Sequence, residues 1–147
     1  MLRSQLLRRL PLSAFITGNR RTVLAPGELL IAIHLPRPAH EARSAFRKLG
    51  ARRYLVISIA MAAATLEIAD GRVAAARIAV GACSAVAQRL PALEAALAGA
   101  SADTTLAERV EAAHLAPLSP IDDVRASAVY RHDAVVTLLR RLLRSFA

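Results

Sequence analysis

The sequence has 147 residues, 55% of them hydrophobic, which predicts one packed domain, with or without an arm, rather than a disordered chain. Only 3% of the residues are aromatic, so the core must rely on small side chains, and a base-stacking platform for nucleic acid is disfavoured. The formal net charge of +9 indicates a nucleic acid, an anionic membrane or an acidic protein as partner, or a compositional drift towards arginine and alanine.

The cysteine content and the apolar runs indicate the compartment. Cys83 is the only cysteine and cannot form an internal disulfide or a cysteine-based metal site, so we expect a reducing, cytoplasmic location. We interpret Cys83 as a small buried residue rather than as a nucleophile. No run reaches the roughly 18 apolar residues of a membrane helix, because Arg53 and Glu67 flank the apolar run 54–66. We therefore expect no membrane and no nucleic acid as partner.

The N-terminal stretch 1–27 is rich in arginine, and the first acidic residue of the chain is Glu28. This composition superficially resembles a transit peptide. It fits equally well the remainder of a longer arginine-rich chain that has been cut short, which is the interpretation we prefer.

A short strand is predicted over residues 29–35. Its apolar and β-branched side chains follow the turn signal Pro26-Gly27 and end at Pro36, which lacks the backbone donor of a strand ladder. His34 is expected to point outward from this strand rather than to bind a ligand.

A long β-hairpin is the central prediction. Ser44–Leu49 forms a short strand that leads into it, and the two apolar runs 54–66 and 73–83 form its arms. Asp70-Gly71 lies between the arms, and this pair favours a tight hairpin turn because both of its positions tolerate positive φ angles.

The return arm changes the face on which its apolar residues lie. Val73 is at an odd position, whereas Ile78 is at an even one, so a regular strand cannot bury both and a bulge or strand end is expected near 74–77. A helix over 55–68 is the main alternative, since alanine favours helices. The turn signal and the β-branched flanks favour strands.

The pattern becomes helical after Gln88. We predict helices over 91–99 and 104–113, the second capped by Asp103 or Thr104, and a last helix that starts near Asp122-Asp123. Apolar residues of this last helix are expected in the core: Val129, Val135, Val136, Leu139, Leu142, Leu143 and Phe146.

Strands followed by helices predict an α+β fold, an antiparallel sheet of three to four strands packed against about three helices. Residues 36–43 are interpreted as a linker between two parts of the chain. The predicted domain organisation is therefore 1–38 and 39–147.

Catalytic motifs are scarce. The sequence contains no phosphate-binding loop, no dinucleotide-binding glycine motif and no metal-spaced histidines or cysteines. Asp122-Asp123 fits an acid–base carboxylate pair less well than a helix cap. His132 beside Asp133 fits either an oriented base or a surface residue, of which the second is the more common.

Lys48 is the only lysine of the chain. Because every other cation is arginine, one lysine on a predicted strand suggests a site that needs a compact point charge. Arg52 and Arg53 lie close by in sequence, so a phosphate or an electron-rich ring could bind there. Chance retention of a lysine at a solvated turn is the equally weighted alternative.

The order of motifs resembles the FAD-binding, or medium, subunit of the molybdenum hydroxylases, the family of xanthine dehydrogenase and aerobic-type carbon monoxide dehydrogenase. The similarity covers most of the chain from about Leu10 and is strongest to the C-terminal domain of that subunit. Four stretches in the same order carry it: 18–36, 46–53, 70–97 and 120–131.

The resemblance implies that electrons pass from a molybdopterin centre through iron–sulfur clusters to FAD and then to NAD⁺ or another acceptor. It implies that Lys48 approaches the isoalloxazine ring, that Leu30 approaches the flavin, and that Arg53 belongs to a mobile loop beside it. It also implies a molybdopterin-binding large subunit and an iron–sulfur small subunit as partners. The carbon monoxide dehydrogenase flavoprotein C-terminal-domain fold is the fold expected for 39–147.

The sequence departs from the family pattern in several places. The glycine-rich loops that hold the FAD diphosphate in the family are missing, and Asn19 replaces the usual tyrosine. Residues 1–38 are therefore interpreted as the remnant of the FAD-binding domain, and the flavin site as incomplete. A cofactor-free scaffold and a basic nucleic-acid binder are the alternative functions.

Overall fold

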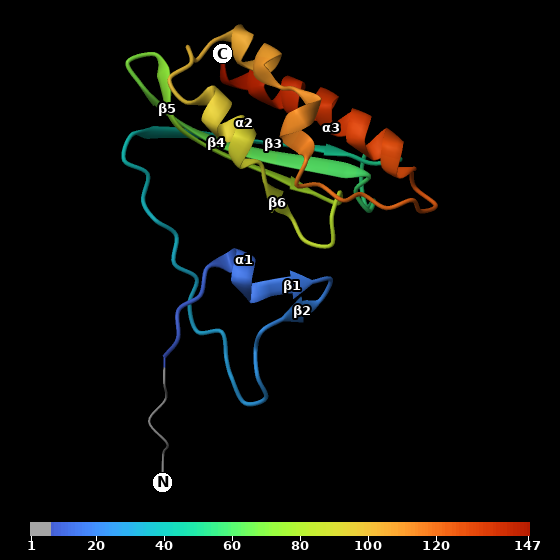
Figure 1. Cartoon of the computed structure of the whole chain (residues 1–147). Helices are drawn as coiled ribbons and strands as arrows, with labels where there is room; N and C mark the ends of the chain where they lie inside the picture. Colours follow the sequence, from blue (N-terminus) through green and yellow to red (C-terminus); the bar gives the residue numbers. More distant parts are fainter. Residues whose placement is uncertain (1–6) are drawn as a thin grey trace. The chain divides into compact units, whose positions relative to one another are not determined.

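The computed structural model describes residues 7–147 and divides the chain into two compact units, 1–35 and 36–147 (Figure 1). Residues 1–6 of the arginine-rich N-terminal stretch lie outside the described residues.

The first unit contains little regular structure. A four-residue helix, α1 (Leu12–Phe15), precedes a small antiparallel pair of strands, β1 (Ile16–Gly18) and β2 (Arg21–Thr22). None of its described residues is buried, so this unit has no core of its own.

The predicted strand over residues 29–35 is wrong. The segment forms no ladder with any strand among residues 7–147, and Leu29, Ile33 and Leu35 are all more than 70% exposed. A strand needs a neighbouring chain to satisfy its backbone groups, and its apolar alternation alone cannot replace that partner. His34 is exposed in this irregular segment.

The second unit contains a four-stranded antiparallel sheet in the order β3-β4-β5-β6. Its strands are β3 (Glu41–Leu49), β4 (Ala60–Ala69), β5 (Arg72–Gly81) and β6 (Gln88–Arg89). Figure 1 shows the helices gathered on one face of this sheet. The α+β fold predicted from the sequence is therefore confirmed.

The hairpin of β4 and β5 forms as predicted around Asp70 and Gly71, whose φ angles are 51° and 70°. The register shifts so that Glu67 pairs with Ala75 and Ile68 with Val73, which leaves Ala74 as the extra residue of a bulge. The predicted bulge thus falls inside the expected range. It allows residues of opposite parity to share the buried face.

The first arm of the hairpin is shorter than predicted. β4 begins at Ala60, and residues 50–59 form a loop rather than the start of a strand. Leu55 has a φ angle of 47° and is 93% exposed. The apolar run therefore continues through a loop, because side chains from β3 and the loop itself bind its backbone carbonyls.

The helical layer is only partly as predicted. α2 (Pro91–Leu97) is confirmed, but the predicted helix over 104–113 is two short 3₁₀ helices, η1 (Thr104–Arg109) and η2 (Ala112–Leu115). Asp103 caps η1 as expected, since its carboxylate accepts a hydrogen bond from the backbone N–H of Thr105 at 2.8 Å.

The last helix starts later than predicted. α3 (Ala128–Leu143) begins after its cap Ser127, and the 3₁₀ turn η3 (Arg144–Phe146) follows it. Val129 is 73% exposed rather than in the core. It lies two residues, about 200°, from the buried stripe, whose members are Arg131, Val135, Leu139, Leu142 and Leu143.

Candidate functional site

Lys48 lies on β3, on the face of the sheet that the helices do not cover. Its neighbours Arg47 and Leu49 pair with the buried Ala62 and Ala60, so the side chain of Lys48 takes the opposite face beside Met61. The Lys48 Nζ donates a hydrogen bond to the backbone carbonyl of Val56 at 2.7 Å. The lysine therefore fixes the loop that follows its own strand.

The loop 50–59 is held from within by close packing and hydrogen bonds. A Cβ atom at Gly50 would lie 2.6 Å from the Val56 side chain, so only glycine fits this close approach. Arg52 donates through Nε to the carbonyl of Leu55 at 3.2 Å. The loop has a defined path although most of its side chains face solvent.

Arg131 of α3 anchors the far end of this loop. Arg131 is 2% exposed. Its guanidinium donates hydrogen bonds to the carbonyls of Ile59 and Ala82, and one to the carboxylate of Asp123 at 2.7 Å. The burial and the anchoring role of Arg131 were not predicted from the sequence. The available signal was its position four residues before Val135, in the apolar stripe of the helix.

Arg53 lies in the same loop, with its guanidinium carbon 5.4 Å from the centre of the Tyr54 ring, a cation–π contact. The structure thus places Lys48 and Arg53 on one strand and its adjoining loop. Leu30 lies in the first unit, in an irregular segment, and is 54% exposed.

The aspartate pair has structural roles. Asp122 accepts a hydrogen bond from the backbone N–H of Ala128 at the start of α3. The backbone N–H of Arg125 contributes most to lowering the pKa of Asp123, and the guanidinium groups of Arg131 and Arg125 lower it further. Asp123 therefore remains ionised and cannot act as a general acid near neutral pH.

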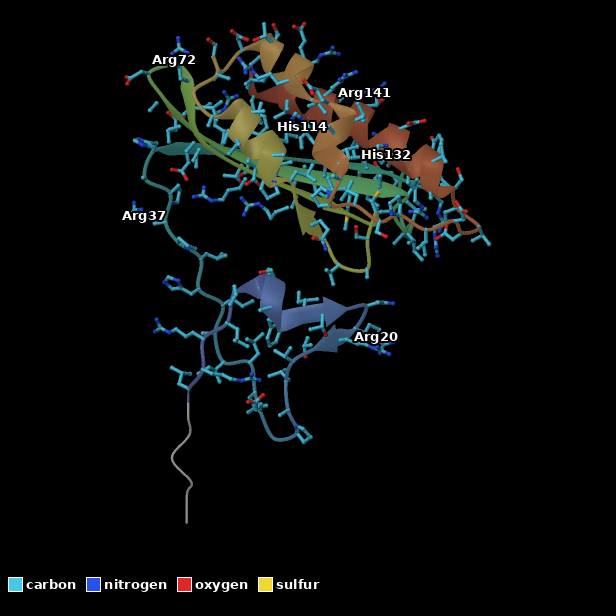
Figure 2. The ribbon with its side chains drawn as sticks, in the orientation of Figure 1. Arg20, Arg37, Arg72, His114, His132 and Arg141 are labelled. Carbon is cyan, nitrogen blue, oxygen red and sulfur yellow. The ribbon has the colours of Figure 1, made fainter. Side chains whose placement is uncertain are left out.

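The described residues form neither a metal-binding group nor an oriented histidine base. Residues 7–147 contain no group of three histidine, cysteine, aspartate or glutamate side chains arranged to hold a metal ion. Within the same range, no hydrogen bond or ion pair joins His132 (labelled in Figure 2) to Asp133. None of the helices described is long and apolar enough to span a membrane.

Sequence comparisons with known proteins identify a family and a relative of this chain. The sequence pattern of the CO dehydrogenase flavoprotein C-terminal domain matches residues 44–146. The nicotine 6-hydroxylase medium subunit of Paenarthrobacter nicotinovorans is 35% identical over 127 residues, which cover 86% of this chain and 44% of that protein.

Solved structures give the same result for the fold. Reconstituted CO dehydrogenase from Oligotropha carboxidovorans matches with a TM-score of 0.78 and 27% identity, covering 91% of this chain and 48% of that one. Quinoline 2-oxidoreductase from Pseudomonas putida 86 matches with a TM-score of 0.78 and 28% identity, covering 91% and 46%. The chain thus spans less than half the length of these relatives. It belongs to the CO dehydrogenase flavoprotein C-terminal domain family, as the order of its sequence motifs predicted.

Proposed function

We propose that this chain forms part of the FAD-binding medium subunit of a molybdenum hydroxylase of the xanthine dehydrogenase type. In such a complex FAD accepts electrons from iron–sulfur clusters and passes them to NAD⁺ or another acceptor. The similarity to a nicotine 6-hydroxylase medium subunit supports the subunit assignment. The proposed partners are a molybdopterin-binding large subunit and an iron–sulfur small subunit, and the proposed location is the cytoplasm.

The observation that carries the proposal is the environment of Lys48. It is the only lysine of the chain, it lies on the uncovered sheet face, and one of its three N–H donors is used by the carbonyl of Val56. Two donors remain for a ligand. A fixed ammonium of this kind fits the edge of a flavin ring, where it stabilises negative charge on the reduced form.

The residues of this chain fit only one side of such a site. Lys48 and Arg53 would supply cations near the ring, and Leu30 an apolar contact. Residues 7–147 supply no glycine-rich loop for the FAD diphosphate. We therefore propose that the flavin is shared with a part of the subunit that this sequence does not contain.

A cofactor-free scaffold is the second candidate function. It is favoured by the lack of a glycine-rich loop for the FAD diphosphate in residues 7–147. The two functions differ in what the chain carries when it is isolated with its natural partners.

The experiment is purification through a C-terminal tag from the native host under mild conditions. If the chain is a flavoprotein subunit, a molybdopterin-binding large subunit and an iron–sulfur small subunit should purify with it, and the sample should show the absorbance of flavin and iron–sulfur clusters. A colourless chain without large partners would contradict it and favour the scaffold.

Substitution of Lys48 tests its role in the purified complex. Lys48→Met should lower the flavin reduction potential, because it removes a charge that stabilises the reduced form, and should therefore slow reduction of the flavin by its electron donor. Lys48→Arg, which keeps the charge, is the matched control, and its flavin reduction potential should stay close to that of the parent protein. An unchanged potential in Lys48→Met would exclude the proposed contact.

A further inference from the structure

A groove lies between the edge strand β3 and the helix α3 in the second unit. Its volume is about 430 Å³, and both elements contribute cations and leucines to its lining. The lining residues are Arg47, Lys48 and Leu49 of β3, Leu138 and Arg141 of α3, and Arg144 of η3. Figure 2 labels Arg141 on α3.

Three arginines of this groove, Arg47, Arg141 and Arg144, have no carboxylate partner among the described residues. All three are exposed, and none takes part in the ion pairs formed among residues 7–147. The helix dipole accounts for cations near the end of α3 but not for Arg47, which comes from a strand. Gathered like charges repel each other, so the groove is arranged to receive an anionic partner.

The apolar residues that line the groove indicate which class of anionic partner fits it. Leu49 and Leu138 are half-buried between the arginines, and no aromatic side chain lines the groove. Single-stranded nucleic acids bind through stacking of their bases on aromatic rings, and no aromatic ring lines this groove. A peptide that carries both carboxylate and apolar side chains fits the lining better.

The free edge of β3 provides the second half of the site. β3 has nine residues and pairs with β4 along one side, whereas its other side pairs with no strand among residues 7–147. Unpaired backbone groups on an edge strand bind extended peptides by adding a strand to the sheet.

We propose that the groove between β3 and α3 is a docking site for an extended acidic segment of a partner protein. Carboxylates of this segment bind Arg47, Arg141 and Arg144, and its apolar side chains cover Leu49 and Leu138. The inference does not depend on flavin binding and stands or falls separately from the proposed function.

The test uses the full chain and a fluorescein-labelled peptide of alternating glutamate and leucine, followed by fluorescence anisotropy. Replacing Arg47, Arg141 and Arg144 together by glutamine should weaken binding by roughly tenfold or more. The control replaces Arg9, Arg20 and Arg72, which are also exposed, by glutamine and removes the same total charge. Its affinity should change by less than about threefold. Circular dichroism checks that each variant is folded.

A charge-reversed groove provides an independent measurement. The variant R47E/R141E/R144E should lose the glutamate–leucine peptide and gain binding to a lysine–leucine peptide. Equal weakening by the groove and control substitutions would overturn the proposal, because only the overall charge would then matter. Tighter binding of oligothymidylate, or equally effective displacement of the peptide by inorganic pyrophosphate, would also overturn it in favour of nucleic acid or a small anion.

Discussion

Glu67 is the carboxylate that joins the segment before β3 to the sheet. It is 3% exposed, forms an ion pair with Arg77, and accepts hydrogen bonds from the backbone N–H groups of Ala39 and His40 at 3.0 and 3.4 Å. The side chain of Arg77 contributes most to lowering the pKa of Glu67 below its ordinary value of 4.5, and the backbone donors add to this effect.

This pKa shift predicts a pH dependence of stability. Because the folded-state pKa lies below the unfolded value, the carboxylate stabilises the fold above the ordinary glutamate range, and this contribution is lost as the pH falls through it. Glu67→Gln should therefore flatten the dependence of the urea midpoint on pH between about pH 3 and pH 6.

Glu41→Gln is the matched control for this measurement, because Glu41 is exposed and forms no ion pair among the described residues. A Glu67→Gln profile as steep as that of the parent protein would show that Glu67 does not contribute to acid sensitivity.

Cys83 is confirmed as a small buried residue. It is fully buried, as expected for a small core residue. Burial raises the pKa of its thiol, although the charge of Arg131 partly opposes this shift. The thiolate needed for nucleophilic chemistry is therefore disfavoured at neutral pH.

The β4–β5 hairpin turns at two residues with positive φ angles, Asp70 and Gly71. Gly71 has a φ angle of 70°, and a Cβ atom there would meet nothing within 4 Å. Gly71→Ala should therefore destabilise the protein by about 1 kcal/mol, entirely through backbone conformation and without a steric clash. Urea unfolding followed by circular dichroism measures the change.

Gly18→Ala serves as the comparison, since Gly18 lies on β1 and a Cβ atom there would make only ordinary contacts at 3.8 Å. It should leave the unfolding of the second unit unchanged. A Gly71→Ala variant as stable as the parent would contradict the positive-φ turn.

Arg131 shows how one side chain connects several elements. It joins α3 to the end of the loop 50–59 and to Ala82 after β5, and Asp123 completes the contact. An arginine in a helical stripe can equally well project its head to solvent. Its burial follows from the backbone carbonyls of Ile59 and Ala82, which flank β4 and β5 and need a donor.

The core formed by residues 7–147 lies entirely within the second unit. The buried residues among 7–147 fall between Ile59 and Phe146, and the first unit contributes none. A chain consisting of residues 36–147 should therefore fold and unfold cooperatively, with a free energy of unfolding within about 0.5 kcal/mol of that of the full chain.

Urea unfolding of the two chains measures this difference, and a third chain that starts at residue 50 is the control. Its loss of β3 removes the partner strand of β4, and it should fail to fold. If the chain 36–147 were unfolded, the first unit would have to be part of the cooperative structure.

The sequence was sufficient to predict those structural features whose signals are local or periodic. The Asp70-Gly71 turn, the bulge at Ala74 and the apolar stripe of α3 follow from the alternation of side chains along one strand or helix. The family could also be inferred from four motifs in order, and its match to residues 44–146 confirms it.

The remaining features depend on residues distant in sequence. The stretch 29–35 has a strand-like pattern but pairs with no strand in the described part of the chain. The run from Tyr54 becomes a loop because Lys48 and Arg52 bind its carbonyls. The groove of Arg47 and Arg141 exists only because α3 packs across β3. Hydrogen-bond partners and neighbouring charges in three dimensions, which no single stretch encodes, fixed these parts of the protein.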